Sequence, residues 1–256
     1  MNNSLIYGTT LFVGGVLAVN KVFEKILYCP YPSNVKNNWL YGRKVEEEQK
    51  ESKDEKPSTS AIASRKFLFF HGNVGNAYIQ TPDVLMNNLL GDYYIFEYSG
   101  YGNNSHLPLD KEENIKRGVE ALKIISTKEE PVYVIGQSLG SGVAAEVASL
   151  HPELVKGLIL LTPYTSVKDL VSSYVPFLGS FIYKHNYNCI DNISKFTALN
   201  RNVIIVGAQR DEVIPYKHSL DIANWHNCNL ISVNCKHNEL YKNIDKWLPQ
   251  LITSLI

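Results

Sequence analysis

The 256-residue chain has little cysteine and no excess of charge of either sign. Lysine plus arginine number 25, as do aspartate plus glutamate, so no overall field favours a nucleic-acid partner. The sequence has no internal repeat and no low-complexity segment, which argues against a repeat architecture. The spacing of the cysteines fits neither a metal site nor a disulfide scaffold, so we expect reduced thiols and neither a metal nor a cofactor. The four are Cys29, Cys189, Cys228 and Cys235.

The rest of the composition is typical of a globular protein. Hydrophobic residues make up 45% of the chain and charged residues 20%. A chain of this length can form one domain with a substantial buried core.

The N-terminal segment is the least polar part of the chain. Residues 1–20 carry no charged side chain, and residues 5–19 are mostly apolar. A bilayer-spanning helix needs about 20 apolar residues, so the segment is close to spanning length. Two interpretations stay open for residues 1–28: a membrane anchor, or a hydrophobic helix packed on the domain that residues 29–256 form. A cleaved signal peptide fits less well, because no lysine or arginine precedes the apolar run.

Strand-like and helix-like segments alternate after residue 65. The apolar runs at 158–161 and 203–206 are typical of central strands covered on both faces. Alternation of this kind predicts a mostly parallel, doubly wound α/β sheet. The expected strands are 66–70, 93–98, 132–136, 157–162, 202–207 and 229–234, and the expected helices are 77–90, 111–126, 141–150, 216–224 and 239–255.

An aromatic and apolar stretch at residues 164–196 interrupts this alternation. We interpret it as a small cap over the carboxyl edge of the sheet, between the expected strands 157–162 and 202–207.

The most informative motif is Gly-x-Ser-x-Gly at residues 136–140. It directly follows a predicted strand and directly precedes a predicted helix. The two glycines allow a sharp strand-to-helix turn that exposes the hydroxyl of Ser138. The N-terminus of the following helix can stabilise negative charge on an oxygen that Ser138 attacks. This context indicates the nucleophile of a serine hydrolase.

Polar residues follow other predicted strands at the same edge of the sheet, where ligands bind in such folds. Asp211 follows strand 202–207 and is the candidate acid, with Glu212 next to it as a rival. His237 follows strand 229–234 and is the candidate general base, since an imidazole titrates near neutral pH. The order Ser138, Asp211, His237 is that of α/β-hydrolases.

A glycine-containing loop follows the first predicted strand at residues 71–76. The backbone N–H groups of Asn73 and Leu139 are the candidate oxyanion hole. His71 fits a role in bracing this loop better than the role of catalytic base.

Four motifs together resemble a known family: residues 70–76, 98–102, 136–140 and 162–166. They look like the membrane-associated α/β-hydrolase-domain proteins of eukaryotes, a group with protein depalmitoylases and orphan members carrying a single-pass N-terminal anchor. The resemblance covers residues 67–240 and implies an α/β-hydrolase fold, in which the cap lies between strands 6 and 7. The N-terminus lacks the cysteine cluster of the palmitoylated depalmitoylases, which disfavours anchoring by acylation.

The resemblance implies that Ser138 is the nucleophile, Asp211 the acid, His237 the base, and that Asn73 and Leu139 are the oxyanion donors. The expected reaction is hydrolysis of acyl esters or thioesters through an acyl-enzyme, with a lipidated protein as the family-derived substrate and the N-terminal segment as the link to a membrane. Two alternatives stay open: a lipase-like esterase for lipids or small esters, and a non-catalytic, membrane-tethered interaction module.

Overall fold

The computed structural model describes residues 15–18, 20–22, 24, 27–30, 40–43, 65–77, 83–89 and 91–255. The strands are β1 (Cys29–Pro30), β2 (Leu40–Arg43), β3 (Arg65–Phe70), β4 (Val74–Gly75), β5 (Gly91–Phe96), β6 (Val132–Gln137), β7 (Val155–Leu161), β8 (Asn202–Ala208) and β9 (Asn229–Val233). The α-helices are α2 (Asp83–Met86), α3 (Lys111–Ile125), α4 (Leu139–Leu150), α5 (Val167–Tyr174), α6 (Cys189–Thr197), α7 (Lys217–His226) and α8 (Leu248–Ser254). Short 3₁₀ turns are η1 (Pro152–Leu154), η2 (Leu178–Phe181), η3 (His237–Glu239) and η4 (Tyr241–Lys246).

The main sheet within the described residues has seven strands in the order β2-β5-β3-β6-β7-β8-β9. Only β2 runs antiparallel to its neighbour, and all other pairs are parallel. This confirms the predicted, mostly parallel sheet. Because the strands are parallel, their carboxyl ends meet at one edge, where the loops after β3, β6, β7, β8 and β9 come together.

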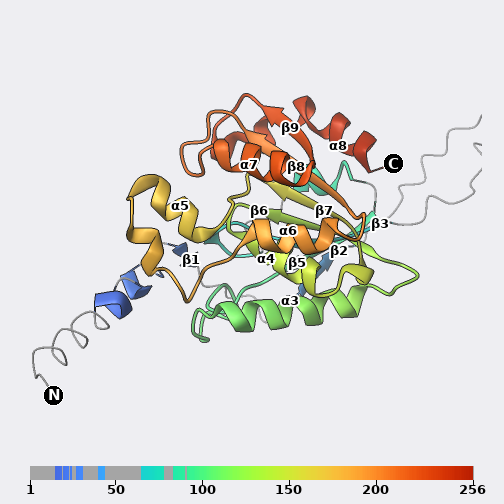
Figure 1. The fold of residues 1–256 in the computed structure, drawn as a ribbon. Helices are drawn as coiled ribbons and strands as arrows, with labels where there is room; N and C mark the ends of the chain where they lie inside the picture. Colours follow the sequence, from blue (N-terminus) through green and yellow to red (C-terminus); the bar gives the residue numbers. More distant parts are fainter. Residues whose placement is uncertain are drawn as a thin grey trace, which may run out of the picture.

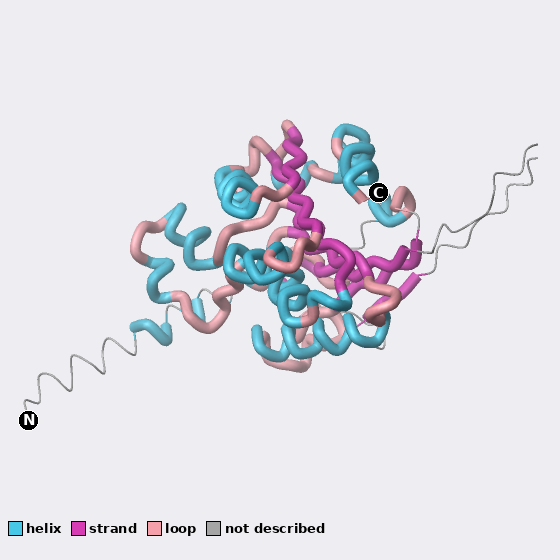
Figure 2. Tube along the Cα trace, turned by 45° about the vertical axis from the view of Figure 1, so that its right-hand side comes forward, coloured by secondary structure: helices cyan, strands magenta, loops and turns pink. Residues whose placement is uncertain are grey.

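Helices cover both faces of this sheet, as Figures 1 and 2 show. Alternate side chains of β3 belong to different cores: Leu68 and Phe70 pack with α3, α4, α6 and α7, whereas Phe67 and Phe69 pack with α2 and α8. All four are fully buried. Burial on both faces explains why the central strands have no polar alternation.

Two of the expected helices differ from the structure. Only α2 is described within the expected helix 77–90, and residues 78–82 and 90 lie outside the described residues. The prediction of one helix over 239–255 is wrong, since η3, η4 and α8 occupy this stretch. Asn243 has a non-helical backbone inside η4, and a proline stands in the first turn of α8. The buried indole of Trp247 donates a hydrogen bond to the carbonyl of Leu240 across the break.

The predicted cap, residues 164–196, divides into two parts. Its second part is α6, which is amphipathic and packs against α4 and α7 as part of a layer over the sheet. Cys189, Ile193 and Phe196 lie on one face of α6 and are buried in the core. The protruding part is therefore smaller than expected and consists of α5, η2 and the loop that leads to α6 (Figure 1).

The described N-terminal residues contact this protruding part. Residues 15–18, 20–22, 24 and 27 are helical. The amide of Asn20 donates to the carbonyl of Phe181 at 2.7 Å, and its oxygen accepts from the N–H of Tyr183 at 3.3 Å. One turn later Glu24 lies 3.5 Å from the ring of His185. The boundary after residue 28 stays a prediction, but these contacts join residues 20–28 to the hydrolase domain.

None of the helices in the described residues is both long enough and apolar enough to cross a bilayer. Residues 1–14 and 19, which make up most of the predicted anchor, lie outside that part of the chain.

Candidate active site

Ser138 occupies a sharp turn between β6 and α4. Its backbone has φ 52° and ψ −118°, a conformation that residues other than glycine rarely adopt. The N–H of Ser138 donates to the carbonyl of Leu161 at 2.9 Å, which ties the turn to the end of β7. A strained residue held in this way by its surroundings is typical of a functional position.

The two glycines of the motif are required by close packing. A Cβ at Gly136 would overlap the carbonyl oxygen of Gly140 and the side chain of Ala144. A Cβ at Gly140 would overlap the backbone carbonyls of Phe70 and His71. The motif therefore brings α4 against both β6 and the end of β3, which sets the direction of Ser138.

His237 lies between Ser138 and Asp211. Its Nε2 is 3.1 Å from the Oγ of Ser138, and its Nδ1 is 2.7 Å from Oδ2 of Asp211. The side chains of His237 and Asp211 are 7% and 2% exposed, so their contact is shielded from water. The structure thus brings together the three residues selected from the sequence, which lie 99 and 26 positions apart along the chain.

The second oxygen of the Asp211 carboxylate is also held. Oδ1 accepts the backbone N–H groups of Val213 at 2.9 Å and Ile214 at 2.7 Å. These bonds leave Oδ2 directed at the imidazole. The carboxylate of the rival Glu212 accepts the backbone N–H of His237 at 3.3 Å, whereas the two ring nitrogens face Asp211 and Ser138. The orientation of the imidazole therefore depends on Asp211, with Glu212 bracing the loop of His237.

The two candidate oxyanion donors come from different segments of the chain. Leu139 is the first residue of α4, and Asn73 is in the loop after β3. Within the described chain, neither N–H donates to a protein acceptor. The Asn73 loop is fixed by its carbonyl, which accepts from Cys29 at 2.9 Å and from the hydroxyl of Tyr101 at 2.7 Å. Two rigidly held donors without a protein partner are what an oxyanion hole needs.

His71 is fully buried and braces this loop from beneath. Its Nδ1 lies 2.7 Å from the carbonyl of Gly72, and its Nε2 lies 3.3 Å from the carboxylate of Glu97. The other oxygen of Glu97 accepts the N–H of Ala77 at 3.1 Å. Glu97 was not predicted from the sequence, although a lone acid after an aromatic strand is a signal for a buried partner.

A group of buried tyrosines packs against the start of α4, and it too was not predicted from the sequence. The hydroxyl of Tyr164 donates to the carbonyl of Leu139 at 3.2 Å, while Tyr28 lies 3.2 Å from both Tyr187 and His185. Burial raises the pKa of Tyr164 and of Tyr28 well above the ordinary value, so both remain neutral donors. These rings connect the N-terminal helix to the base of α4.

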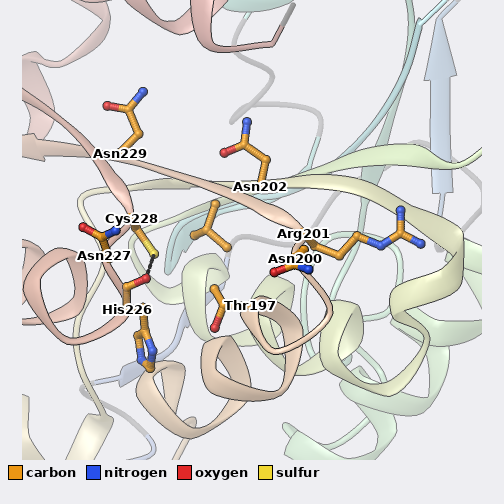
Figure 3. A pocket seen from close by; sticks show the side chains of 9 residues that line it. Thr197, Asn200, Arg201, Asn202, His226, Asn227, Cys228 and Asn229 are labelled. Atoms are coloured by element: carbon orange, nitrogen blue, oxygen red, sulfur yellow. Dashed lines mark hydrogen bonds between the residues drawn. The ribbon is translucent and has the colours of Figure 1, made fainter.

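A separate pocket of about 390 Å³ lies at the opposite, amino-terminal edge of the sheet. Figure 3 shows it between the starts of β8 and β9, with Cys228 near the carbonyl of His226. Burial raises the pKa of the Cys228 thiol to about 11, so this cysteine is not a nucleophile near neutral pH. The pocket lacks every triad residue.

Metal ligation has no support at the triad. In the part of the chain that the structure describes, no three histidine, cysteine, aspartate or glutamate side chains come together in a way that could hold a metal ion.

Comparison with known proteins agrees with this architecture. A family model described as "alpha/beta hydrolase fold" matches residues 66–177. The chain is 28% identical over 178 residues to the protein bem46 of Schizosaccharomyces pombe, which covers 65% of this chain and 55% of that protein. It is 29% identical over 175 residues to the human alpha/beta hydrolase domain-containing protein 17B, covering 63% of this chain and 55% of that protein. The chain spans about half the length of the curated relatives it matches.

Among solved structures, a carboxylesterase of Nitrososphaera gargenis superposes with a TM-score of 0.58 at 14% identity. The superposition covers 84% of this chain and 93% of that chain. The chain therefore has the α/β-hydrolase fold, and its homologues are α/β-hydrolase-domain proteins.

Proposed function

We propose that this chain is a serine hydrolase that cleaves acyl esters or thioesters through an acyl-enzyme. The observation that carries the proposal is the double contact of His237, at 3.1 Å to the Oγ of Ser138 and at 2.7 Å to Asp211. The α/β-hydrolase fold and the carboxylesterase with the same fold support hydrolysis as the reaction class.

In the proposed first step, the Oγ of Ser138 attacks the acyl carbonyl and its proton passes to Nε2 of His237. The negative oxygen that forms on the carbonyl carbon accepts the N–H groups of Leu139 and Asn73. Asp211 stabilises the imidazolium through Nδ1. The carbon–oxygen or carbon–sulfur bond then breaks, and the leaving alcohol or thiol takes the proton from His237.

In the second step, water attacks the acyl-enzyme and gives a proton to Nε2 of His237. Collapse of the second tetrahedral intermediate releases the carboxylic acid, and the proton returns to Ser138. The cycle consumes one water and needs no redox partner, metal or cofactor.

The finer substrate assignment is an acyl thioester on a lipidated protein, held near a membrane by residues 1–28. Its support is the resemblance of the four motifs to the depalmitoylase group and the similarity to human alpha/beta hydrolase domain-containing protein 17B. This preference is measured by supplying the purified protein with acyl esters and acyl thioesters of graded chain length. Faster turnover of long-chain thioesters than of matched esters supports the assignment, and the reverse ranking supports a lipase-like esterase.

A fluorophosphonate probe, which reacts with activated serines, tests the chemistry itself. The wild-type chain should become labelled, and Ser138→Ala should not. The matched control is Ser173→Ala, because Ser173 also lies near a histidine, with its Oγ 3.3 Å from Nε2 of His218. Nδ1 of His218 faces the hydroxyl of Thr165 and has no carboxylate contact. Ser173→Ala should therefore keep full labelling.

The outcome that contradicts the proposal is equal labelling of wild type and Ser138→Ala. A folded wild-type chain that never reacts with the probe would instead support the non-catalytic, membrane-tethered module.

A further inference from the structure

The protruding part between β7 and β8 exposes an unusual number of large apolar side chains. Phe177 is 84% exposed, and Tyr174, Val175 and Tyr183 are each at least 50% exposed. They lie on the end of α5, on the turn that precedes η2 and on the loop that follows it. We call these four residues the apolar tip. Single exposed apolar residues are common, but a group on one protrusion marks an interaction surface.

The backbone holds the apolar tip in one conformation. Phe177 has φ 70°, in the left-handed region, where a bulky residue is strained. Its carbonyl accepts the N–H of Ser180, and the next turn is closed by Gly179, whose carbonyl accepts the N–H of Ile182 at 3.0 Å. Gly179 is buried, and a Cβ there would overlap the backbone of Lys168 in α5. The phenyl ring of Phe177 is thus presented to solvent by a fixed turn.

The N-terminal helix lies beside the apolar tip and extends it (Figure 1). Asn20 is 4% exposed and binds the backbone of Phe181 and Tyr183. The same helix exposes Leu17 at 49% and Val22 at 60%. The helix that contacts the tip through Asn20 therefore also carries exposed apolar side chains.

Basic residues flank this surface. Lys21 and Lys184 are exposed, and neither forms an ion pair within the described residues. Aromatic rings and lysines around an apolar patch match the interface of a bilayer, where rings lie at headgroup level and ammonium groups meet anionic lipids.

We propose that the apolar tip, with Leu17 and Val22, docks on the surface of an anionic lipid bilayer. The sequence before the helix also favours this occupant, because residues 1–14, which precede the described helical residues, carry no charged side chain.

Docking of this kind would orient the candidate active site. The hydroxyl of Tyr174 bonds to the carbonyls of Glu212 and Val213, next to Asp211. The edge of the site that carries the acid loop would therefore lie nearest the lipid. This consequence rests on the proposed hydrolase function, whereas lipid contact does not.

Photo-crosslinking in the full chain tests lipid contact directly. Phe177→benzoylphenylalanine is irradiated with vesicles of phosphatidylcholine, with and without phosphatidylserine. The matched control is Trp225→benzoylphenylalanine, because Trp225 is also large, apolar and 70% exposed but stands on α7. We expect lipid adducts at position 177 that increase with phosphatidylserine, and on the order of tenfold fewer at position 225.

Three outcomes overturn the proposal: equal lipid adducts at both positions, no lipid adduct at position 177, or a covalent dimer in place of the lipid adduct. A covalent dimer would mean that the apolar tip contacts a second copy of the chain. Lys21→Gln combined with Lys184→Gln should remove the phosphatidylserine dependence, and its persistence would contradict the role of the lysines.

A second readout separates docking from chemistry. Phe177→Asp should lower turnover of a long-chain ester embedded in vesicles by about tenfold, through lost apolar contact with the bilayer. Turnover of a short soluble ester should stay within about twofold of wild type, since the Phe177 side chain is 84% exposed and takes no part in the hydrogen bonds of the triad. Equal loss on both substrates overturns the proposal. If neither ester is hydrolysed by wild type, the proposed function fails and the crosslinking result still decides lipid contact.

Discussion

The phenol hydroxyl of Tyr174 donates to the backbone carbonyl of Glu212 at 3.1 Å and shares the same hydrogen with the carbonyl of Val213 at 3.0 Å. Tyr174 is the last residue of α5, whereas Glu212 follows Asp211 in the loop after β8. One side chain therefore couples the protruding part of the molecule to the loop that aligns the triad imidazole.

Tyr174→Phe removes this hydrogen bond and keeps the ring. Loss of one hydrogen bond costs about 0.5–1.5 kcal/mol, so we expect kcat on a soluble ester to fall roughly two- to tenfold with little change in KM. The control is Tyr183→Phe, on the same protrusion, which removes a hydroxyl that makes no hydrogen bond to another described residue. Steady-state kinetics of both variants check the prediction, and an equal decrease in the two would contradict a specific role for Tyr174.

Asp211→Asn should be much more damaging than Glu212→Gln. An amide at position 211 cannot stabilise the imidazolium of His237, so kcat should fall by about 10³–10⁴ while KM changes little. The side-chain carboxylate of Glu212 accepts the backbone N–H of His237 at 3.3 Å, and the amide oxygen of a glutamine there can still accept that bond. Glu212→Gln should therefore lower kcat by less than about tenfold. Measured kcat values in the opposite order would mean that Glu212 is the acid.

The candidate triad could be predicted from sequence because each member lies in the segment that follows a strand, Ser138 after β6, Asp211 after β8 and His237 after β9. Parallel strands bring such positions to one edge, so chain order and strand ends were enough to choose Ser138, Asp211 and His237. The glycine spacing also predicted the turn, because local packing leaves no room for a side chain at Gly136 or Gly140.

The supporting residues could not be predicted, because their roles depend on contacts between distant parts of the chain. Asn20 contacts residues more than 160 positions away, and Tyr28 meets His185 and Tyr187 at separations of 157 and 159. Nothing in local hydrophobic periodicity encodes such pairs. The break after Leu240 also escaped prediction, because the tertiary burial of Trp247 overrides helical periodicity there.

Gly140→Ala tests the close packing of the motif. The added methyl group would meet the carbonyls of Phe70, the last residue of β3, and of His71, which directly follows it. Forced overpacking costs about 1–3 kcal/mol, so the thermal midpoint should drop by several degrees together with probe labelling. Gly15→Ala is the matched control, because a Cβ there meets nothing within 4 Å. An unchanged midpoint in Gly140→Ala would contradict the described approach of α4 to β3.

Stability should depend on pH through His185. Burial lowers the pKa of His185, and Lys184 acts in the same direction, while Glu24 and Asp110 oppose it by attraction. Because the folded pKa lies below the ordinary value, the unfolded chain binds more protons between the two, so stability is lost as pH falls through about 6.5. We expect a lower unfolding midpoint at pH about 5.5 than at pH about 7.5, measured by calorimetry.

The contribution of His185 is isolated by His185→Gln, which cannot titrate. This variant should lose less of its stability over the same acid range than the wild type. His218, whose pKa burial also lowers, remains in both chains and accounts for part of the residual slope. Identical pH slopes for the two proteins would mean that His185 does not contribute.

Truncation distinguishes the two interpretations of the N-terminal segment. Removal of residues 1–14 keeps Asn20, Glu24 and Tyr28 and so preserves their contacts with the protruding part. Removal of residues 1–28 also deletes Tyr28, which is 2% exposed and binds His185 and Tyr187. Loss of a buried tyrosine from a packed core costs about 3–5 kcal/mol. We therefore expect the shorter deletion to leave a folded, probe-reactive protein, and the longer deletion to lower the thermal midpoint or to aggregate. Equal midpoints and equal labelling of the two truncated proteins would show that residues 15–28 add nothing to the hydrolase domain.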